Sequence, residues 1–167
     1  DASSMSFITN LRADRLIAEI KATDQTGQTD NAKALEKLAK LGPSAIPRII
    51  DALASAGKQE TAGFVSVLSA LLDYRTFPSI AAGLVDGNQR TVAAVTWALS
   101  TGRNYPTSLL LALLENPEMP KSQVVSILAA QKQRLNARDV LQRAYAQEPA
   151  EKAAMFRIVG EIADETL

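Results

Sequence analysis

Apolar residues recur along most of this chain at spacings of three and four, which is the period of an amphipathic helix. Between residues 30 and 147 this pattern fills short stretches that form four pairs. The pairs span residues 30–56, 60–85, 88–115 and 121–147. The alternation typical of strands joined by hairpin turns does not occur, so the pattern predicts an all-α chain.

Three prolines give the pairs a common register. Pro47, Pro78 and Pro106 each follow an apolar residue and begin an apolar stretch, and the two intervals between them are nearly equal. A further step as long as the first interval leads to Ala137, where a fourth unit fits without its proline. Proline favours the first turn of a helix, because the amide hydrogen that it lacks would have no partner there. Each marker therefore predicts the start of the second helix of a pair.

The segments between the two helices of a pair are short and turn-forming. They cover residues 41–44, 73–76 and 101–104, and Gly42 and Gly102 stand where a helix end favours a left-handed residue. Such short turns force the two helices to run antiparallel. A single pair cannot bury its own apolar faces, so we expect successive pairs to stack on one another.

The stretch from Leu84 to Leu99 resembles the core motif of HEAT-like repeats. The residues at motif positions are Asp86, Arg90, Ala93, Ala94 and Ala98. In that family an Asp in the turn between repeats and an Arg early in the next helix help to join neighbours, and small residues permit close packing. The other units keep less of the motif, and the repeat period is shorter than is usual for the family. The resemblance implies a right-handed α-α superhelix (solenoid) of about four HEAT-like helical hairpins with an N-terminal capping helix.

Both ends of the chain extend this single repeat domain. Residues 1–29 are expected to supply a leader and the capping helix, with Met5 as the natural start and the four residues before it left by cloning. Residues 150–167 predict a terminal helix that resembles the first helix of a pair with no second helix after it. This favours a fragment of a longer protein.

Composition narrows the chemistry that this chain can perform. Eighteen Lys and Arg balance eighteen Asp and Glu, so no net charge attracts nucleic acid or an anionic membrane. The absence of Cys and His excludes thiol and imidazole catalysis and zinc sites with nitrogen and sulfur ligands. The sequence has no glycine-rich nucleotide loop and no apolar run that could span a bilayer. We predict a soluble, cytoplasmic protein without a cofactor or membrane insertion, not an enzyme, with any catalytic domain outside this chain.

An arginine lies three residues before each of the last three markers. Arg75, Arg103 and Arg134 would then form a row along one edge of the stack, able to bind phosphates or an acidic partner segment. The alternative is that each cation faces water at a helix C-terminus, where the helix dipole favours it. The leading functional hypothesis is an adaptor that holds a protein partner on a concave face lined by the second helices. Arg48 and Arg138 would add polar contacts on that face, and Leu111 an apolar contact.

A second basic cluster leaves another function open. Lys132, Arg134, Arg138 and Arg143 are opposed locally by Asp139 alone. This balance suggests a HEAT-like nucleic-acid-binding protein or a DNA glycosylase-type enzyme, for which duplex DNA would be the partner. A pigment lyase of the HEAT-like kind is a third possibility, by family analogy alone. Trp97, the only tryptophan, is flanked by Ala and Leu and is expected to be a buried packing residue of the repeat motif.

Overall fold

The computed structural model describes residues 2–25 and 31–166, and within them the side chains of residues 6–23 and 31–165. This part of the chain is helical and contains no strand, so the all-α prediction is confirmed. The α-helices are α1 (Ala2–Gln25), α2 (Ala32–Lys40), α3 (Ile46–Leu53), α4 (Lys58–Leu71), α5 (Phe77–Ala81), α6 (Gln89–Thr101), α7 (Thr107–Ala112), α8 (Lys121–Ala130), α9 (Ala137–Ala144) and α10 (Pro149–Thr166). Four 3-10 segments adjoin them, η1 (Pro43–Ala45), η2 (Ala82–Val85), η3 (Leu113–Glu115) and η4 (Lys132–Arg134).

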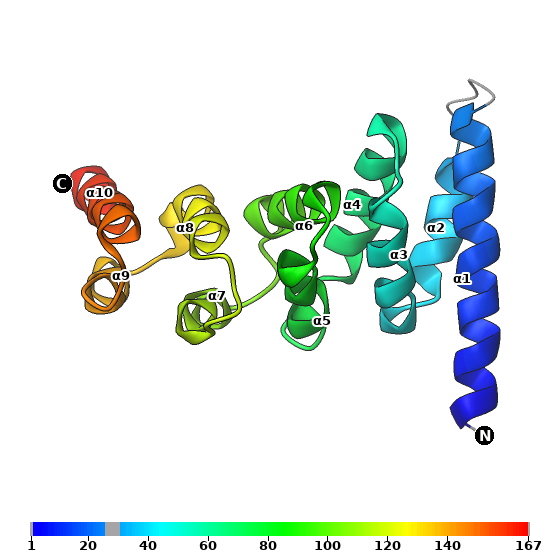
Figure 1. The fold of residues 1–167 in the computed structure, drawn as a ribbon, viewed down its shortest axis with the longest axis horizontal. Helices are drawn as coiled ribbons and strands as arrows, with labels where there is room; N and C mark the ends of the chain where they lie inside the picture. Colours follow the sequence, from blue (N-terminus) through cyan, green and yellow to red (C-terminus); the bar gives the residue numbers. More distant parts are fainter. Residues whose placement is uncertain (1, 26–30, 167) are drawn as a thin grey trace.

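The helices stand in a row of pairs along the longest axis of the molecule (Figure 1). The first helices of the pairs form one layer, in which α2 contacts α4, α4 contacts α6, α6 contacts α8, and α8 contacts α10. The second helices of the pairs are α3, α5, α7 and α9, and in Figure 1 the helices α5, α7 and α9 lie below α6, α8 and α10. We call the outward surface of the first layer the first-helix face.

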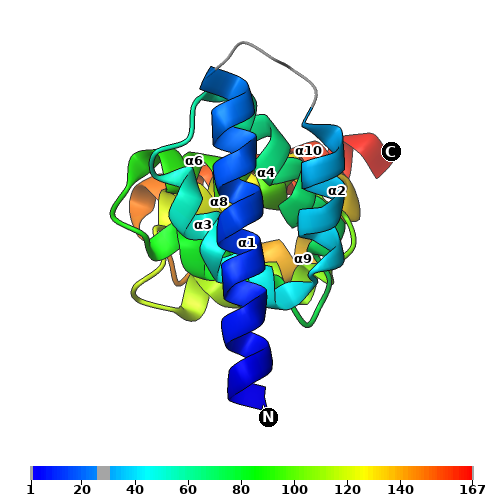
Figure 2. The same ribbon diagram turned by 90° about the vertical axis from the view of Figure 1, so that its right-hand side faces the viewer.

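Helix α1 closes one end of the row. It packs against both α2 and α3 through Ala13, Ile17 and Ile20, which are buried. Its N-terminal half extends past the helices that it covers (Figures 1 and 2). The expectation about Met5 concerns residues whose side chains lie outside the described part. None of the described helices is long and apolar enough to cross a membrane.

The core lies between the two layers and continues from one pair to the next. Its largest fully buried side chains come from the part of the row between α1 and α7: Ile20, Leu38, Ile46, Ile49, Leu53, Phe64, Leu68, Leu72, Ile80, Leu84, Leu99 and Leu110. Burial of each side chain of this size stabilises the fold by about 1.5–3 kcal/mol relative to exposure in water. The helices between α1 and α10 are short, so this packing rather than their intrinsic propensity holds them.

The proline markers begin helices as the register predicts. Pro47 and Pro78 lie in the first turns of α3 and α5, and Pro106 directly precedes α7. Asn88 and Asn136 cap α6 and α9, because their side chains accept hydrogen bonds from the first amides of each helix.

The two turn glycines serve different purposes. Gly42 has a φ of 79°, the left-handed conformation that was predicted. Gly102 has a φ of −71°, so the prediction of a left-handed residue is wrong there. A Cβ on Gly102 would lie 2.6 Å from Leu72 Cδ2 and 2.9 Å from the Ala98 carbonyl oxygen. A side chain at position 102 would therefore crowd the Leu72 side chain, just after α4, and the backbone at the end of α6.

Candidate functional site

A hollow on the first-helix face, between α4 and α6, is the strongest candidate site. It has a volume of about 360 Å³ and is open to solvent. We call it the Trp97 groove, and its lining residues are Ala56, Gly57, Lys58, Thr61, Arg90, Ala93, Ala94 and Trp97. Trp97 is 46% exposed, so the prediction that it is buried is wrong.

The outward position of Trp97 follows from the helical pattern of α6. Thr91, Ala94, Val95, Ala98 and Leu99 form the buried stripe of this helix, at spacings of three and four. Trp97 falls off that stripe and follows Arg90 and Ala93 along the opposite side. Of the small residues that resemble the HEAT-like motif, Ala94 and Ala98 pack in the core, whereas Ala93 and the large indole stay at the surface.

The α6 wall of the groove is held by a chain of hydrogen bonds. The Asn88 side chain accepts from the amides of Arg90 and Thr91, at 2.9 and 3.3 Å. The Asn88 side chain also donates to the Ala54 carbonyl at 3.5 Å, and Arg90 Nη1 donates to the Ala56 carbonyl at 3.4 Å. These two contacts join the start of α6, in the third pair, to the residues that follow α3 at the end of the first pair.

This arrangement refines the joining role that the resemblance assigned to Asp86 and Arg90. Arg90 does reach another unit, the pair that ends at Ala56. Asp86 instead stays within its own turn, where its Oδ1 accepts from the amide of Asn88 at 2.8 Å. Asn88, which the sequence reasoning did not single out, supplies the second contact between units.

The α4 wall begins with a self-capped helix start. Glu60 Oε2 accepts from the Gly57 amide at 2.9 Å, and Thr61 Oγ1 donates to the Gly57 carbonyl at 2.8 Å. Glu60 is 7% exposed, so its carboxylate belongs to this cap rather than to the groove. Lys58, in the same turn, remains exposed at the rim.

Two further hollows continue along the first-helix face. One lies between α6 and α8, has a volume of about 580 Å³ and shares Ala93 with the Trp97 groove. Its polar lining includes Asp86, Thr96 and Gln123, and Thr96 Oγ1 lies 3.3 Å from Gln123 Oε1. The other hollow lies between α8 and α10. Helix α6 is therefore a ridge with a groove on each side.

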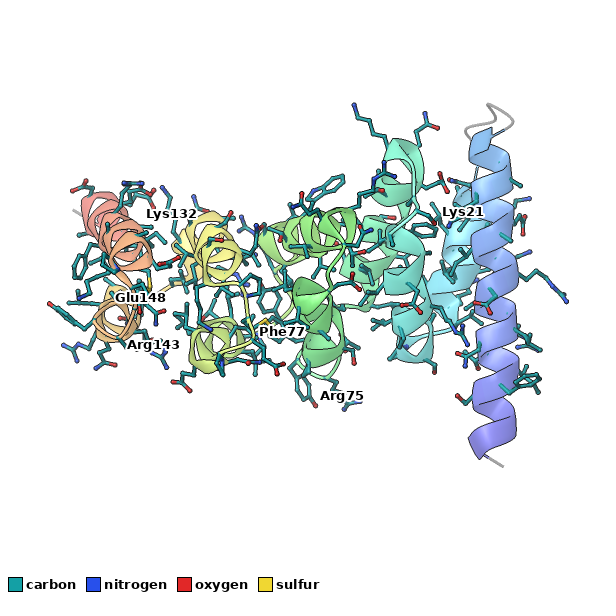
Figure 3. All side chains as sticks on the ribbon, in the orientation of Figure 1. Lys21, Arg75, Phe77, Lys132, Arg143 and Glu148 are labelled. Carbon is teal, nitrogen blue, oxygen red and sulfur yellow. The ribbon has the colours of Figure 1, made fainter. Side chains whose placement is uncertain are left out.

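The predicted arginine row does not form as three available cations. Arg75 and Arg103 are exposed, and Figure 3 shows Arg75 pointing away from the stack. Arg75 Nε donates to Tyr74 Oη at 2.9 Å, within the same turn. Arg134 is instead folded against the preceding unit, so the row is wrong for this residue.

Arg134 belongs to a polar cluster that we call the Tyr105 junction, formed by Tyr105, Gln131 and Arg134. Arg134 Nη1 donates to the Tyr105 carbonyl at 2.8 Å, Nε donates to Gln131 Oε1 at 2.9 Å, and the guanidinium lies 4.9 Å from the Tyr105 ring centroid. Gln131 Nε2 lies 2.9, 3.0 and 2.7 Å from the carbonyl oxygens of Leu99, Ser100 and Gly102. Tyr105 donates its hydroxyl to the Leu99 carbonyl. Burial raises the pKa of Tyr105 to about 12, although the Arg134 charge offsets part of that rise.

The other predicted contacts on the second helices are also altered. Leu111 is 3% exposed, because it belongs to the buried face of α7 together with Leu110, and so it cannot serve as a surface contact. Arg48 Nη1 lies 3.8 Å from Asp14 Oδ2 of the capping helix. Arg138 is exposed in the first turn of α9.

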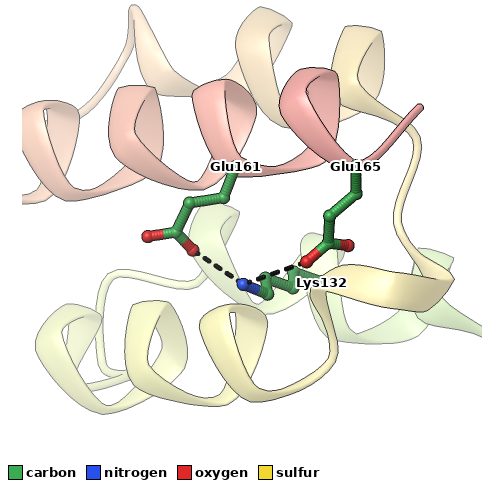
Figure 4. Close-up of polar contacts among 3 residues, drawn as sticks. All are labelled: Lys132, Glu161 and Glu165. Carbon is green, nitrogen blue, oxygen red and sulfur yellow. Dashed lines mark hydrogen bonds and ion pairs between the residues drawn. The ribbon is translucent and has the colours of Figure 1, made fainter. Parts of the chain in front are cut away.

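The basic cluster around residues 132–143 is partly neutralised by the terminal helix. Lys132 Nζ lies 3.1 Å from Glu161 and 3.4 Å from Glu165 of α10 (Figure 4). The hydrogen bonds that Lys132 donates to the carboxylates of Glu161 and Glu165 raise its pKa. Arg143 Nη1 donates to the Asp139 carbonyl at 3.2 Å. The local balance of four cations to one carboxylate is therefore corrected to four cations and three carboxylates.

Compared with protein families, with curated proteins and with solved structures, this chain matches none. Its own geometry is therefore the basis for a functional proposal. That geometry offers one exposed tryptophan in a groove between two first helices, rather than a row of arginines or a concave leucine.

Proposed function

We propose that this chain is a HEAT-like binding scaffold that holds a peptide segment of a protein partner, with the Trp97 groove as its principal contact. In this proposal the row of helix pairs is a right-handed α-α superhelix of about four hairpins, and it has no catalytic role of its own. The single observation that carries the proposal is the half-exposed indole of Trp97 above the small side chains of Ala93 and Ala94.

Tryptophan in a hollow is the side chain that contributes most often to binding hot spots. It offers a large apolar surface with little conformational entropy to lose, and hot spots are strongest where a pocket excludes water. A groove of about 360 Å³ lies within the range of small binding sites. Its walls are held in place, because α4 and α6 pack against each other and the start of α6 is bonded to the residues that follow α3.

The exposed arginines at the turn edge remain a second contact surface within the same proposal. Arg75 and Arg103 are both available there, whereas Arg134 is not. The nucleic-acid alternative has less support, because Lys132 is paired with Glu161 and Glu165. Protein recognition is therefore the function that the described surface favours.

Selection of random dodecapeptides displayed on phage would test the proposal. Peptides selected on the wild-type chain should bind it and lose at least about tenfold in affinity, or about 1.4 kcal/mol, on the Trp97→Ala variant. Tyr145→Ala is the matched control, since Tyr145 is an aromatic residue 66% exposed elsewhere on the chain, and it should leave binding unchanged. A failure to select any peptide, or equal binding to the Trp97→Ala variant, would overturn the groove as the site.

The double variant Arg75→Glu/Arg103→Glu tests the turn edge separately. If the same peptides bind it as well as the wild type, this edge makes no contact with them and the groove alone carries recognition. A weakened interaction with unchanged thermal stability would include the edge in the binding surface.

A further inference from the structure

We propose that the Trp97 groove selects partner segments in which an apolar side chain lies next to carboxylates. This inference rests on the proposed function and specifies its ligand. The groove is lined by two cations, Lys58 at the start of α4 and Arg90 at the start of α6, and by no Asp or Glu. The remaining walls are formed by small side chains and Trp97.

The charge of this groove differs from that of four other hollows on the described surface. The hollow between α6 and α8 has Asp86 as its only charged lining residue. The other three mix both signs: Arg157 with Glu161 between α8 and α10, two cations with two carboxylates between α1 and α3, and the same balance between η3 and α9. Purely cationic lining beside an exposed indole is therefore a property of the Trp97 groove rather than of grooves between helices in general.

The two cations of the groove are free to pair with a ligand. Neither Lys58 nor Arg90 forms an ion pair with any side chain that the structure describes. The contact of Arg90 Nη1 with the Ala56 carbonyl holds the guanidinium at the rim without neutralising it. Glu60 lies only two residues after Lys58, but side chains at that spacing do not face each other on a helix, and its Oε2 accepts from the Gly57 amide.

The geometry separates two kinds of contact within one ligand. An apolar side chain can pack against the Trp97 ring, Ala93 and Ala94, where contact removes apolar surface from water. Carboxylates on neighbouring ligand residues can pair with Lys58 and Arg90, one on each wall. A cationic segment would meet like charges at both walls, and an acidic segment without an apolar side chain would leave the indole uncovered.

Four acetylated and amidated octapeptides with a fluorescein label would test this selectivity by anisotropy at low salt. The first carries central leucines flanked by Asp, the second has Lys in place of Asp, the third has Ser in place of Asp, and the fourth keeps Asp but has Ser in place of leucine. We expect the first peptide to bind at least about tenfold more tightly than each of the others. Its advantage should shrink as salt is added, because rim charges are screened.

Charge reversal of the rim gives the sharpest comparison. The Lys58→Glu/Arg90→Glu variant should prefer the Lys peptide to the Asp peptide, and Lys58→Glu alone, which leaves the Arg90 contact with Ala56 intact, should already weaken binding of the Asp peptide. Arg12→Glu/Lys33→Glu is the matched control, with the same charge change at an exposed arginine of α1 and an exposed lysine of α2, and it should keep the wild-type preference.

The outcomes distinguish this inference from the proposal beneath it. Equal binding of the Asp, Lys and Ser peptides, lost in each case on Trp97→Ala, would overturn the charge selectivity and leave the groove as a binding site. Equal binding of the Asp peptide to wild type and Trp97→Ala would overturn both. If none of the four peptides binds while the selected dodecapeptides still depend on Trp97, the charge selectivity is overturned and the groove remains a binding site.

Discussion

The Tyr105 junction and the Trp97 groove contain the same kinds of groups and use them in opposite ways. Each combines an aromatic ring and an arginine at a contact between successive units. In the junction, Arg134 lies against the Tyr105 ring and donates two hydrogen bonds inside the protein. In the groove, Arg90 and Trp97 lie at the surface, and Arg90 makes one long contact with a carbonyl. An arginine near an aromatic residue is therefore a candidate ligand contact only where its side chain is exposed, as that of Arg90 is.

Of the changes at these two sites, removal of the Gln131 side-chain amide should have the largest effect on stability. Gln131→Ala leaves the carbonyls of Ser100 and Gly102 without this donor and removes the partner of Arg134 Nε. We expect a loss of about 3 kcal/mol of stability in urea denaturation, because unsatisfied buried polar groups cost roughly 1–3 kcal/mol each. Gln133→Ala, an exposed neighbour in η4, should change stability by less than about 0.5 kcal/mol. Equal effects of the two variants would remove the junction as a stabilising element.

High pH should weaken the junction through Tyr105. Its folded pKa of about 12 lies above the ordinary value of 10, so folding favours the neutral phenol. The stabilisation is complete below pH 10 and is lost as the pH rises from 10 towards 12, by roughly 2 kcal/mol in all. The urea midpoint should therefore fall further between pH 9 and pH 11.5 for the wild type than for Tyr105→Phe. Tyr74→Phe, which removes an exposed phenol, should retain the wild-type pH dependence.

Truncation to alanine should distinguish Arg134, which packs against the fold, from Arg103, which is exposed. Arg134→Ala should cost about 1 kcal/mol, since hydrogen bonds with a charged partner contribute more than neutral ones but the side chain is only partly buried. Arg103→Ala should cost less than about 0.5 kcal/mol, because Arg103 is exposed. Thermal unfolding of the two variants in parallel measures the difference. A loss at Arg103 as large as that at Arg134 would contradict the assignment of only one of them to the fold.

Trp97→Ala should have the smallest effect on stability. The ring is half-exposed, and Ala has the higher helix propensity, so the free energy of unfolding should change by less than about 0.5 kcal/mol. Guanidinium denaturation followed by circular dichroism measures this change, because the variant lacks the only tryptophan and cannot be followed by its fluorescence. A loss several times larger than this would make Trp97 a packing residue after all.

The helices were predictable because local rules determine them. Spacings of three and four fix one apolar stripe, and Pro47 and Pro78 fix where α3 and α5 begin. The same rules would have placed Trp97 outside, since the stripe of α6 is complete without it. The prediction for Trp97 was wrong because it relied on residue type and placed a large aromatic residue flanked by Ala and Leu in the core.

The position of Arg134 could not be read from its neighbours in the sequence. Its partner Tyr105 lies 29 residues earlier, and the carbonyls bound by Gln131 lie 29 to 32 residues earlier. Likewise, Glu161 and Glu165 neutralise Lys132 from the terminal helix, one unit later. Charge counts over a short window miss such pairs, because in stacked units the nearest neighbours of a residue lie one unit away.

The contact between the start of α6 and the end of α3 also bears on synthesis at the ribosome. Asn88 and Arg90 reach back 34 residues, to Ala54 and Ala56, and no further. Contacts of such short range allow rapid folding, and domains generally fold in order as the chain emerges. All residues that line the Trp97 groove lie between Ala56 and Trp97. Both walls of the groove therefore leave the ribosome before Tyr105 does, and a partner could engage them while the later units are still being made.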